Sequence, residues 1–224
     1  GYSSAASDVY KRQIDVIKER AKSSIKTIVL PETEDMRTLE ATDKILKEGV
    51  AKIVLIGNEE EINKKAAEGG FDISGATIVD PETSDRTQAY IDKFVELRAK
   101  KGMTPEKAKE ILHTQYPYYG VMMVKMGDAD GMVSGACHST ADTLRPCLQI
   151  LKTKPGTKLV SAFFLMVVPN CEYGANGAFV FADSGLNQNP TSEELAAIAA
   201  SSAESFELLV QELSLIHISE PTRR

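Results

Sequence analysis

The sequence lacks the features that mark membrane, nucleic-acid-binding and secreted proteins. Its longest apolar run, Ala162–Val168, is far too short to cross a bilayer. It has no basic block, and a net charge of −6 has the wrong sign for a nucleic-acid partner. Three cysteines, Cys137, Cys147 and Cys171, are odd in number and unpatterned, which excludes a disulfide framework and indicates a reducing compartment. These absences predict a cytoplasmic globular protein, either an enzyme or a ligand-binding domain.

Several short motifs are missing as well. Neither G-x-G-x-x-G nor G-x-x-x-x-G-K-[ST] occurs, so dinucleotide-binding and P-loop functions have no basis in the sequence. The spacings of His and Cys match no zinc pattern. What is present is ordinary for a folded protein: 224 residues, 42% hydrophobic and 26% charged. That length can bury the core of one large domain or of two smaller ones.

The two ends differ in character from the rest. GYSSAASDVYKRQ, residues 1–13, contains no apolar signal-peptide segment, and LSLIHISEPTRR, residues 213–224, interrupts a helical pattern. Both strings resemble translated sequencing-adapter read-through, and we expect them to be artefact tails; natural flexible tails are the alternative. Residues 14–212 would then be a fragment whose own C-terminal part is cut off.

Between these ends, strand and helix patterns alternate. Short β-branched and apolar runs predict strands at 27–30, 51–56, 77–79 and 131–133. Helical spacing and capping residues predict helices at 14–24, 35–48, 59–68, 84–101, from 104 onward, and 118–126. Strands separated by helices favour a parallel sheet covered on both faces.

The pattern changes beyond Lys152. Lys158–Val168 and Ala178–Ala182 are predicted strands separated by turn formers, which favours an antiparallel hairpin over a crossover. Thr191–Glu194 is a capping box that opens a helix. The apolar face of that helix is formed by Leu195, Ile198, Ala199, Phe206 and Leu209.

The chemically informative residues concentrate in Asp128–Pro146. A strand there leads into the small-residue loop Ser134–Ala136 and then into a helix that starts at Ser139. Ligands bind beyond the carboxyl ends of strands in open α/β sheets, and a helix N-terminus with hydroxyls and N–H groups is a natural anion site. Arg145 could add a bidentate guanidinium for phosphate or carboxylate. The alternative is that Ser139 only caps the helix and that Arg145 is a surface charge.

Two more arginines lie near helix ends. Arg37 is in the first turn of its helix, an unfavourable place for a cation unless an anion is nearby. Arg98 lies near the end of its helix, where a positive charge suits the helix dipole, so by itself it indicates no function.

Other candidates are weaker. Cys137 beside His138 suggests a thiol nucleophile, but sequence neighbours usually point apart, and no third group is evident. Asp183 follows a predicted strand, where it could be catalytic or could form the turn that leaves the hairpin.

Taken together, these segments resemble the phosphate acetyltransferases, or phosphotransacetylases. The matching strings follow the family's order and cover residues 14–212: IVLPETEDMRTLEA, MMVKMGDADGMVSGACHSTADTLRPCLQI, FFLMVVPNCEYG, FVFADSGLNQNP and FELLVQE. The resemblance implies a truncated two-domain fold like that of isocitrate and isopropylmalate dehydrogenases, with three α/β/α layers and a mainly parallel sheet. Residues 14–154 would form the first α/β domain without its C-terminal return segment, and residues 155–212 the start of the second.

The resemblance also implies a reaction, the reversible conversion of acetyl-CoA and phosphate into CoA and acetyl phosphate. A carboxylate would take the CoA thiol proton so that the thiolate attacks the acetyl carbonyl directly, and arginines would bind the phosphate end. No metal or redox cofactor would be needed at the reacting centre, and the full-length protein would be a homodimer.

Position by position, the resemblance implies substrate-binding roles for Arg37, Arg98 and Arg145, with Ser139 and Thr140 as secondary phosphate contacts. The family's general base and a Ser–Arg pair lie in its C-terminal segment, so no catalytic residue is assigned here, and the fragment itself is expected to be inactive. Two alternatives stay open: an enzyme like phosphate butyryltransferase, and a non-catalytic regulatory domain of this fold that binds acyl-CoA or acyl phosphate.

Overall fold

The structure is a computed structural model that describes residues 4–157, 159–168, 171, 173–175 and 177–210. Its contacts divide the chain into two units: Ala21–Lys152 forms one, and the described residues on either side of it form the other. The division after Lys152 lies two residues before the boundary expected from the sequence, and residues 14–20 fall in the other unit. Among the described helices, none is long and apolar enough to span a bilayer.

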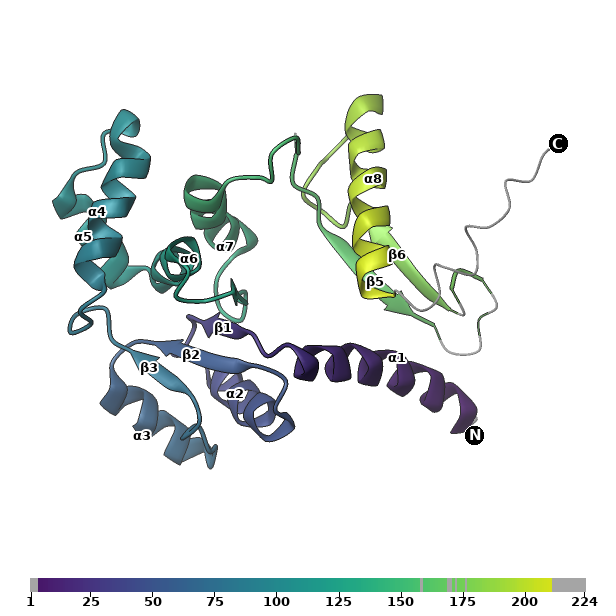
Figure 1. The fold of residues 1–224 in the computed structure, drawn as a ribbon, viewed down its shortest axis with the longest axis horizontal. Helices are drawn as coiled ribbons and strands as arrows, with labels where there is room; N and C mark the ends of the chain where they lie inside the picture. The colour runs from purple at the N-terminus through teal and green to yellow at the C-terminus, as the bar shows by residue number, and fades with distance from the viewer. Residues whose placement is uncertain (1–3, 158, 169–170, 172, 176, 211–224) are drawn as a thin grey trace. The chain divides into compact units, whose positions relative to one another are not determined.

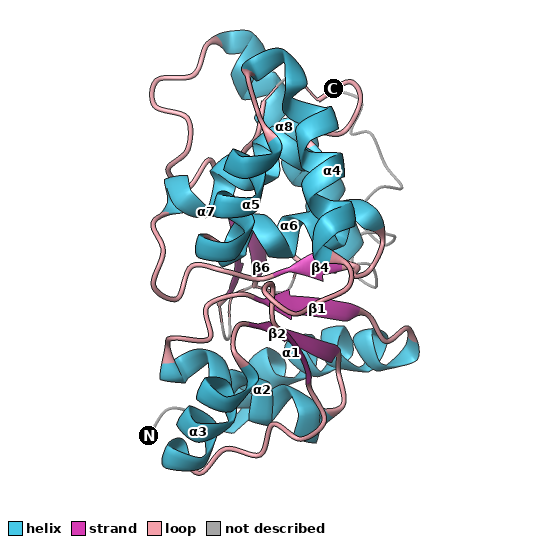
Figure 2. Ribbon diagram, turned by 90° about the vertical axis from the view of Figure 1, so that its left-hand side faces the viewer, coloured by secondary structure: helices cyan, strands magenta, loops and turns pink. Residues whose placement is uncertain are grey.

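A parallel sheet forms the centre of the unit Ala21–Lys152 (Figures 1 and 2). Its strands lie in the order β3-β2-β1-β4. Their bounds are β1 Thr27–Leu30, β2 Lys52–Ile56, β3 Thr77–Val79 and β4 Gly131–Met132. β1 pairs with β2 from Thr27↔Lys52 to Leu30↔Leu55, and β4 joins the other edge of β1 at Ile28↔Gly131. The prediction of an α/β fold with a mainly parallel sheet is confirmed.

Helices follow the strands, and local signals set their ends. Asp35 accepts the N–H of Arg37 at the start of one helix, which ends at Gly49 in the left-handed conformation, with φ +66°. Thr104 caps another helix, with Pro105 at its first position. The helices of this unit are α2 Met36–Glu48, α3 Glu59–Gly69, α4 Thr87–Arg98, the 3₁₀ turn η1 Ala99–Lys101, α5 Pro105–Thr114, α6 Tyr116–Met126, α7 Thr140–Pro146 and the π turn η2 Cys147–Leu151.

The sheet is buried on both faces, with α2 and α3 on one side and α4, α5 and α6 on the other (Figure 2). Successive residues of a strand point to opposite faces, so neighbours enter different cores. Val29 packs in the core that contains Tyr119 and Phe94, whereas Leu30 packs in the core that contains Leu39 and Ile62. Burial on both faces explains why these strands read as continuous apolar runs.

The other unit contains an antiparallel hairpin, as predicted. β5 Phe163–Val167 pairs with β6 Ala178–Ala182, from Phe163↔Ala182 to Val167↔Ala178. The predicted strand Lys158–Val168 was too long, because β6 offers β5 only five partners; Lys158 itself lies outside the described residues. Helix α1, Ser4–Ser23, begins before the predicted residue 14.

Helix α8, Ser192–Leu209, completes this unit. Thr191 and Glu194 form the predicted capping box. The predicted apolar face is only partly covered: Ile198 is buried, and Phe206 and Leu209 pack in a small core with the hairpin, but Leu195 is 54% exposed.

Candidate functional site

One buried carboxylate organises the loop between β4 and α7. Glu32 follows β1 and is 2% exposed. Its Oε2 accepts the backbone N–H groups of Gly135 and Ala136 at 2.6 and 2.8 Å, and its Oε1 accepts those of Cys137 and His138 at 2.9 Å each. Gly135 has φ +117°, a conformation that L side chains rarely adopt, and it lets successive N–H groups converge on one anion.

The pKa of Glu32 reflects this arrangement. Burial alone would raise the pKa, but hydrogen bonds from the N–H groups of Cys137, Ala136 and His138 and from the His138 ring outweigh it and hold the pKa far below its usual range. The backbone N–H groups of the loop therefore already bind an anion, the carboxylate of Glu32. These four N–H groups are not available to a substrate phosphate.

The structure brings Cys137 and His138 together with a third group, contrary to the expectation from sequence. Cys137 Sγ lies 3.6 Å from His138 Nδ1 and 3.3 Å from Glu34 Oε1, and Glu32 contacts both residues. Burial, together with the hydrogen bond to Glu34 and the charges of both carboxylates, raises the pKa of the Cys137 thiol to about 12. The thiol is thus protonated at neutral pH and is not an activated nucleophile.

The same chemistry bears on metal binding. One potential ligand atom each from Glu32, Cys137 and His138 lies within 4.8 Å of the others. Each oxygen of Glu32 already accepts two backbone N–H groups of the loop, so its lone pairs are in use. The trio therefore fits a loop anchor better than a metal site.

The charges of Arg98 and Arg145 act on the same tyrosine. Burial raises the pKa of Tyr118 on α6, while the positive charges of Arg145 and Arg98 act in the opposite direction. The Tyr118 hydroxyl donates to Oε1 of Gln149 at 3.3 Å. Arg98 Nε is buried with no hydrogen-bond partner among the described residues, and Arg145 Nη1 contacts Asp142 Oδ1 at 3.3 Å. Guanidinium groups from α4 and α7 therefore both lie near enough to Tyr118 for their charges to act on its pKa.

Arg37 braces the loop as well. Its Nε and Nη2 donate to the carboxylate of Asp35, with Nη2 at 2.6 Å from Oδ2, and Nη2 also donates to the carbonyl oxygen of Ala136. The negative charge of Asp35 offsets the unfavourable position of a cation in the first turn of α2. The Arg37 side chain remains 70% exposed, so a ligand can reach it.

Ser139 and Thr140 begin α7. The Ser139 hydroxyl accepts the N–H of Asp142 at 3.2 Å and donates to its carboxylate at 2.6 Å, which confirms the predicted capping pattern. Thr140 is exposed at the first position of the helix.

Sequence reasoning missed Glu32, Tyr118 and Gln149. Glu32 sits inside the PETED string that was noticed for Arg37, but its partners are more than 100 residues away. The burial of Glu32, which is unusual for an acid, marks it in the structure, and local sequence does not reveal that burial.

Asp183 forms a turn. Its carboxylate accepts the N–H groups of Gly185, Leu186 and Asn187 at 2.8, 2.9 and 3.2 Å. Of the two alternatives that the sequence left open, these contacts support the turn that leaves the hairpin.

A pocket of about 290 Å³ lies beyond the carboxyl ends of β1 and β2. Its lining includes Glu34, Glu61, His113, Tyr116 and His138. Burial raises the pKa of Tyr116, and nearby carboxylates, including Glu61 and Glu34, raise it further, so the surroundings are acidic. Such a pocket does not favour a phosphate, and the arginines predicted to bind substrate are not among its lining residues.

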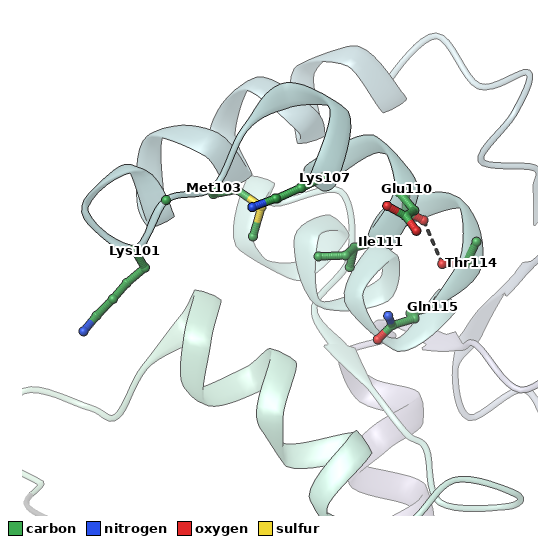
Figure 3. A pocket seen from close by; sticks show the side chains of 8 residues that line it. Lys101, Met103, Lys107, Glu110, Ile111, Thr114 and Gln115 are labelled. Atoms are coloured by element: carbon green, nitrogen blue, oxygen red, sulfur yellow. Dashed lines mark hydrogen bonds between the residues drawn. The ribbon is translucent and has the colours of Figure 1, made fainter.

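A second pocket, of about 270 Å³, lies beside α5 (Figure 3). Its lining includes Lys101, Lys107 and Gln115, and the Thr114 hydroxyl donates to the carbonyl oxygen of Glu110 at its rim at 2.7 Å. In Figure 3, Lys101 extends away from the other labelled side chains, so the two lysines do not converge on one point. The arginine pair beside Tyr118 is therefore the stronger candidate for an anion site.

Residues 13–222 match the family model described as phosphate acetyl/butaryl transferase. Phosphate acetyltransferases of Acetivibrio thermocellus and Thermoanaerobacterium thermosaccharolyticum are 57% and 55% identical to this chain over 197 residues, which is 88% of this chain and 58% and 59% of theirs. The EutD phosphotransacetylase from Staphylococcus aureus has a TM-score of 0.81 and 36% identity over 93% of this chain and 59% of its own. A phosphotransacetylase from Streptococcus pyogenes has a TM-score of 0.82 and 39% identity over 89% and 59%. The chain thus spans less than two thirds of each of these relatives.

Proposed function

The chain belongs to the phosphate acetyl/butaryl transferase family, and from this premise we propose that the whole protein moves an acetyl group reversibly between coenzyme A and inorganic phosphate. The products of the forward reaction are CoA and acetyl phosphate. Relatives at 57%, 55% and 52% identity are phosphate acetyltransferases, which favours acetyl over butyryl transfer and an enzyme over a regulatory domain.

The observation that carries this proposal is the match of residues 13–222 to the family model, and the charges of Arg98 and Arg145, which both act on Tyr118, support it. A guanidinium presents N–H donors in a planar fork that matches phosphate oxygens. Arg98 has a buried Nε without a partner among the described residues, so it has a donor to offer a bound anion. In this proposal the two arginines bind the phosphate end of the substrate and stabilise charge that develops at the acetyl carbonyl.

Arg37, Ser139 and Thr140 complete the proposed substrate contacts. Arg37 is exposed, and the hydroxyl groups of Ser139 and Thr140 lie at the start of α7, the helix that carries Arg145. The CoA thiol must lose a proton before it attacks, and that step needs a positioned base. The proposal places the base in the part of the relatives that this chain does not match.

We also propose that the enzyme works in the cytoplasm. The three described cysteines are free, which suits the reducing cytoplasm. A homodimer is proposed on the family resemblance. The lack of a nucleic-acid or membrane partner is proposed on the net charge of −6 and the absence of long apolar runs in the sequence.

The test joins residues 14–212 to the segment of the Acetivibrio thermocellus relative that this chain does not match. Thioester formation from acetyl phosphate and CoA should appear in the joined protein and be absent from the chain alone, with the relative assayed in parallel. Turnover of butyryl phosphate in preference to acetyl phosphate would favour the butyryl enzyme. Binding of acetyl-CoA without turnover in the joined protein would favour the regulatory domain and overturn the proposal.

A further inference from the structure

We propose that Glu32 is a positioning residue, whose carboxylate holds residues 135–138 so that Ser139 and Arg145 face the substrate. The role rests on the proposed function, since it concerns the geometry of that substrate site. It assigns a purpose to a buried acid that does not itself contact substrate.

Glu32 fixes the backbone of the loop at four successive residues. Each of its oxygens accepts two backbone N–H groups, and His138 Nδ1 adds a further contact at 2.9 Å. Both backbone groups of Ala136 are hydrogen-bonded to side chains: its N–H donates to Glu32, and its carbonyl oxygen accepts from Arg37. Four successive residues of the loop are therefore tied to one side chain.

The loop is one of two anchors for α7. Ser139, the cap of α7, follows His138 directly, so the position of residues 135–138 determines where the helix starts. At the other end, Pro146 is buried and Ile150 is 0% exposed in the core that contains Tyr118. Arg145 lies between the two anchors, and releasing the first would let its guanidinium move relative to Arg98.

The chemistry requires a carboxylate of this length. Glu32→Gln replaces one oxygen with an NH₂ group, and in either orientation of the amide that group faces at least two N–H donors. The amide NH₂ group cannot accept these hydrogen bonds, so buried N–H groups of the loop lose their partners. Glu32→Asp keeps the charge but shortens the side chain by one methylene.

The chain offers a matched control in Asp43, a second buried acid in the same unit. Asp43 is 8% exposed, accepts the N–H of Asp72 at 3.2 Å and pairs with Lys47 at 2.7 Å. Asp43→Asn also removes the charge of a buried carboxylate, but its partners lie outside the loop of residues 135–138.

The first measurement is amide hydrogen exchange on the chain as it stands. Glu32→Gln should speed exchange at Gly135, Ala136, Cys137 and His138 by about tenfold or more, while Asp43→Asn leaves these amides protected. Unchanged protection of the four amides in Glu32→Gln would overturn the proposal. If Glu32→Gln does not fold, as judged by circular dichroism, Glu32→Asp takes its place with the same expectation.

The second measurement uses the joined enzyme. Glu32→Gln should lower kcat/KM for phosphate roughly 10- to 100-fold, because a misplacement of about 1 Å by a group remote from the chemistry can cost about 100-fold. The loss should appear in both KM and kcat, because Arg145 is proposed to bind phosphate and to stabilise the transition state, whereas Asp43→Asn should leave both unchanged. An equal effect of both variants on KM would overturn the proposal. Lack of turnover in the unsubstituted joined enzyme would count against the proposed function instead, and the exchange measurement would still decide the role of Glu32 in the loop.

Discussion

Arg145 makes an exposed contact with Asp142, with 3.3 Å between Nη1 and Oδ1. Surface pairs of this kind contribute little to stability, so the side chain can exchange its partner for a substrate anion at small cost. Arg86, in contrast, donates to Asp128 at 2.7 Å and lies 5.6 Å from the centre of the Tyr90 ring. The two residues should therefore respond differently to substitution.

In the joined enzyme, Arg145→Ala should cost about 2–4 kcal/mol of transition-state stabilisation, the range for losing one such donor. Arg145→Lys should recover only part of the activity, because a point charge cannot replace a planar fork. Steady-state kinetics with phosphate and acetyl-CoA give both values. Arg86→Ala is the control and should leave kcat/KM near that of the parent. Parental kinetics for Arg145→Ala would contradict the assignment.

The thiol of Cys137 should be slow to react despite its exposure. Its raised pKa of about 12 means that the thiolate fraction, and hence the alkylation rate, should rise about tenfold per pH unit with no plateau below that pH. The measurement uses the chain with Cys147→Ala and Cys171→Ala, so that one thiol is labelled by iodoacetamide. Glu34→Gln removes a hydrogen bond and a charge that raise this pKa and should speed labelling at any given pH.

A plateau of the labelling rate near pH 9, the ordinary pKa of a thiol, would contradict the protonated state of Cys137. The same reasoning predicts that the joined enzyme with Cys137→Ala and Cys147→Ala keeps most of its activity. An acetyl thioester trapped on either residue would contradict it.

At the scale of elements, the close approach of α6 to the sheet depends on Gly120. A Cβ atom at this position would lie 2.8 Å from the sulfur of Met132 on β4 and 3.1 Å from Cγ1 of Val29 on β1. The methionine can move aside, but the valine belongs to a buried strand and has little freedom. The glycine therefore sets the distance between helix and sheet.

Gly120→Ala should lower the free energy of unfolding by about 1–3 kcal/mol, the usual cost of overpacking a core. Without the clash, alanine would stabilise a helix by up to about 1 kcal/mol relative to glycine, so the sign of the change is informative. Urea denaturation of the chain gives the value, with exposed Lys125→Ala on the same helix as a control. A variant at least as stable as the parent would show that α6 does not need the glycine.

At the scale of the whole molecule, the hairpin unit leaves large apolar side chains exposed. Phe164 and Phe181 are register partners across β5 and β6, and each is 59% exposed. Leu195 and Leu208 of α8 are 54% and 60% exposed. An isolated two-stranded sheet is marginally stable in water, and contiguous apolar surface marks a place where other protein packs.

The chain alone should therefore bind the dye anilinonaphthalene sulfonate, and Phe164→Ser with Phe181→Ser should reduce the fluorescence. Val133→Ser is the control, because Val133 is 62% exposed in the other unit and single exposed apolar residues are ordinary. Joining the relative's segment should reduce dye binding as well. Equal fluorescence from the chain and the double variant would show that these side chains form no dye-binding surface.

The sequence by itself determined the family, the parallel sheet and most helix ends. These features are local: Thr104, Asp35 and Thr191 cap the helices that follow them, and apolar runs ended by Pro31 or Gly57 mark the strands. Even the antiparallel hairpin followed from turn formers between two apolar runs. Each signal acts within a few residues, so it can be read along the chain.

Only the tertiary structure decided which groups meet. Gly135 donates to Glu32 from 103 positions away, and the charges of Arg98 and Arg145 both act on Tyr118, a residue that the sequence did not connect with either arginine. The length of β5 likewise depends on how many partners β6 offers. Contacts of this kind arise from packing helices onto a sheet, and nothing in local spacing records them, so the carboxylate that holds the loop became visible only in the fold.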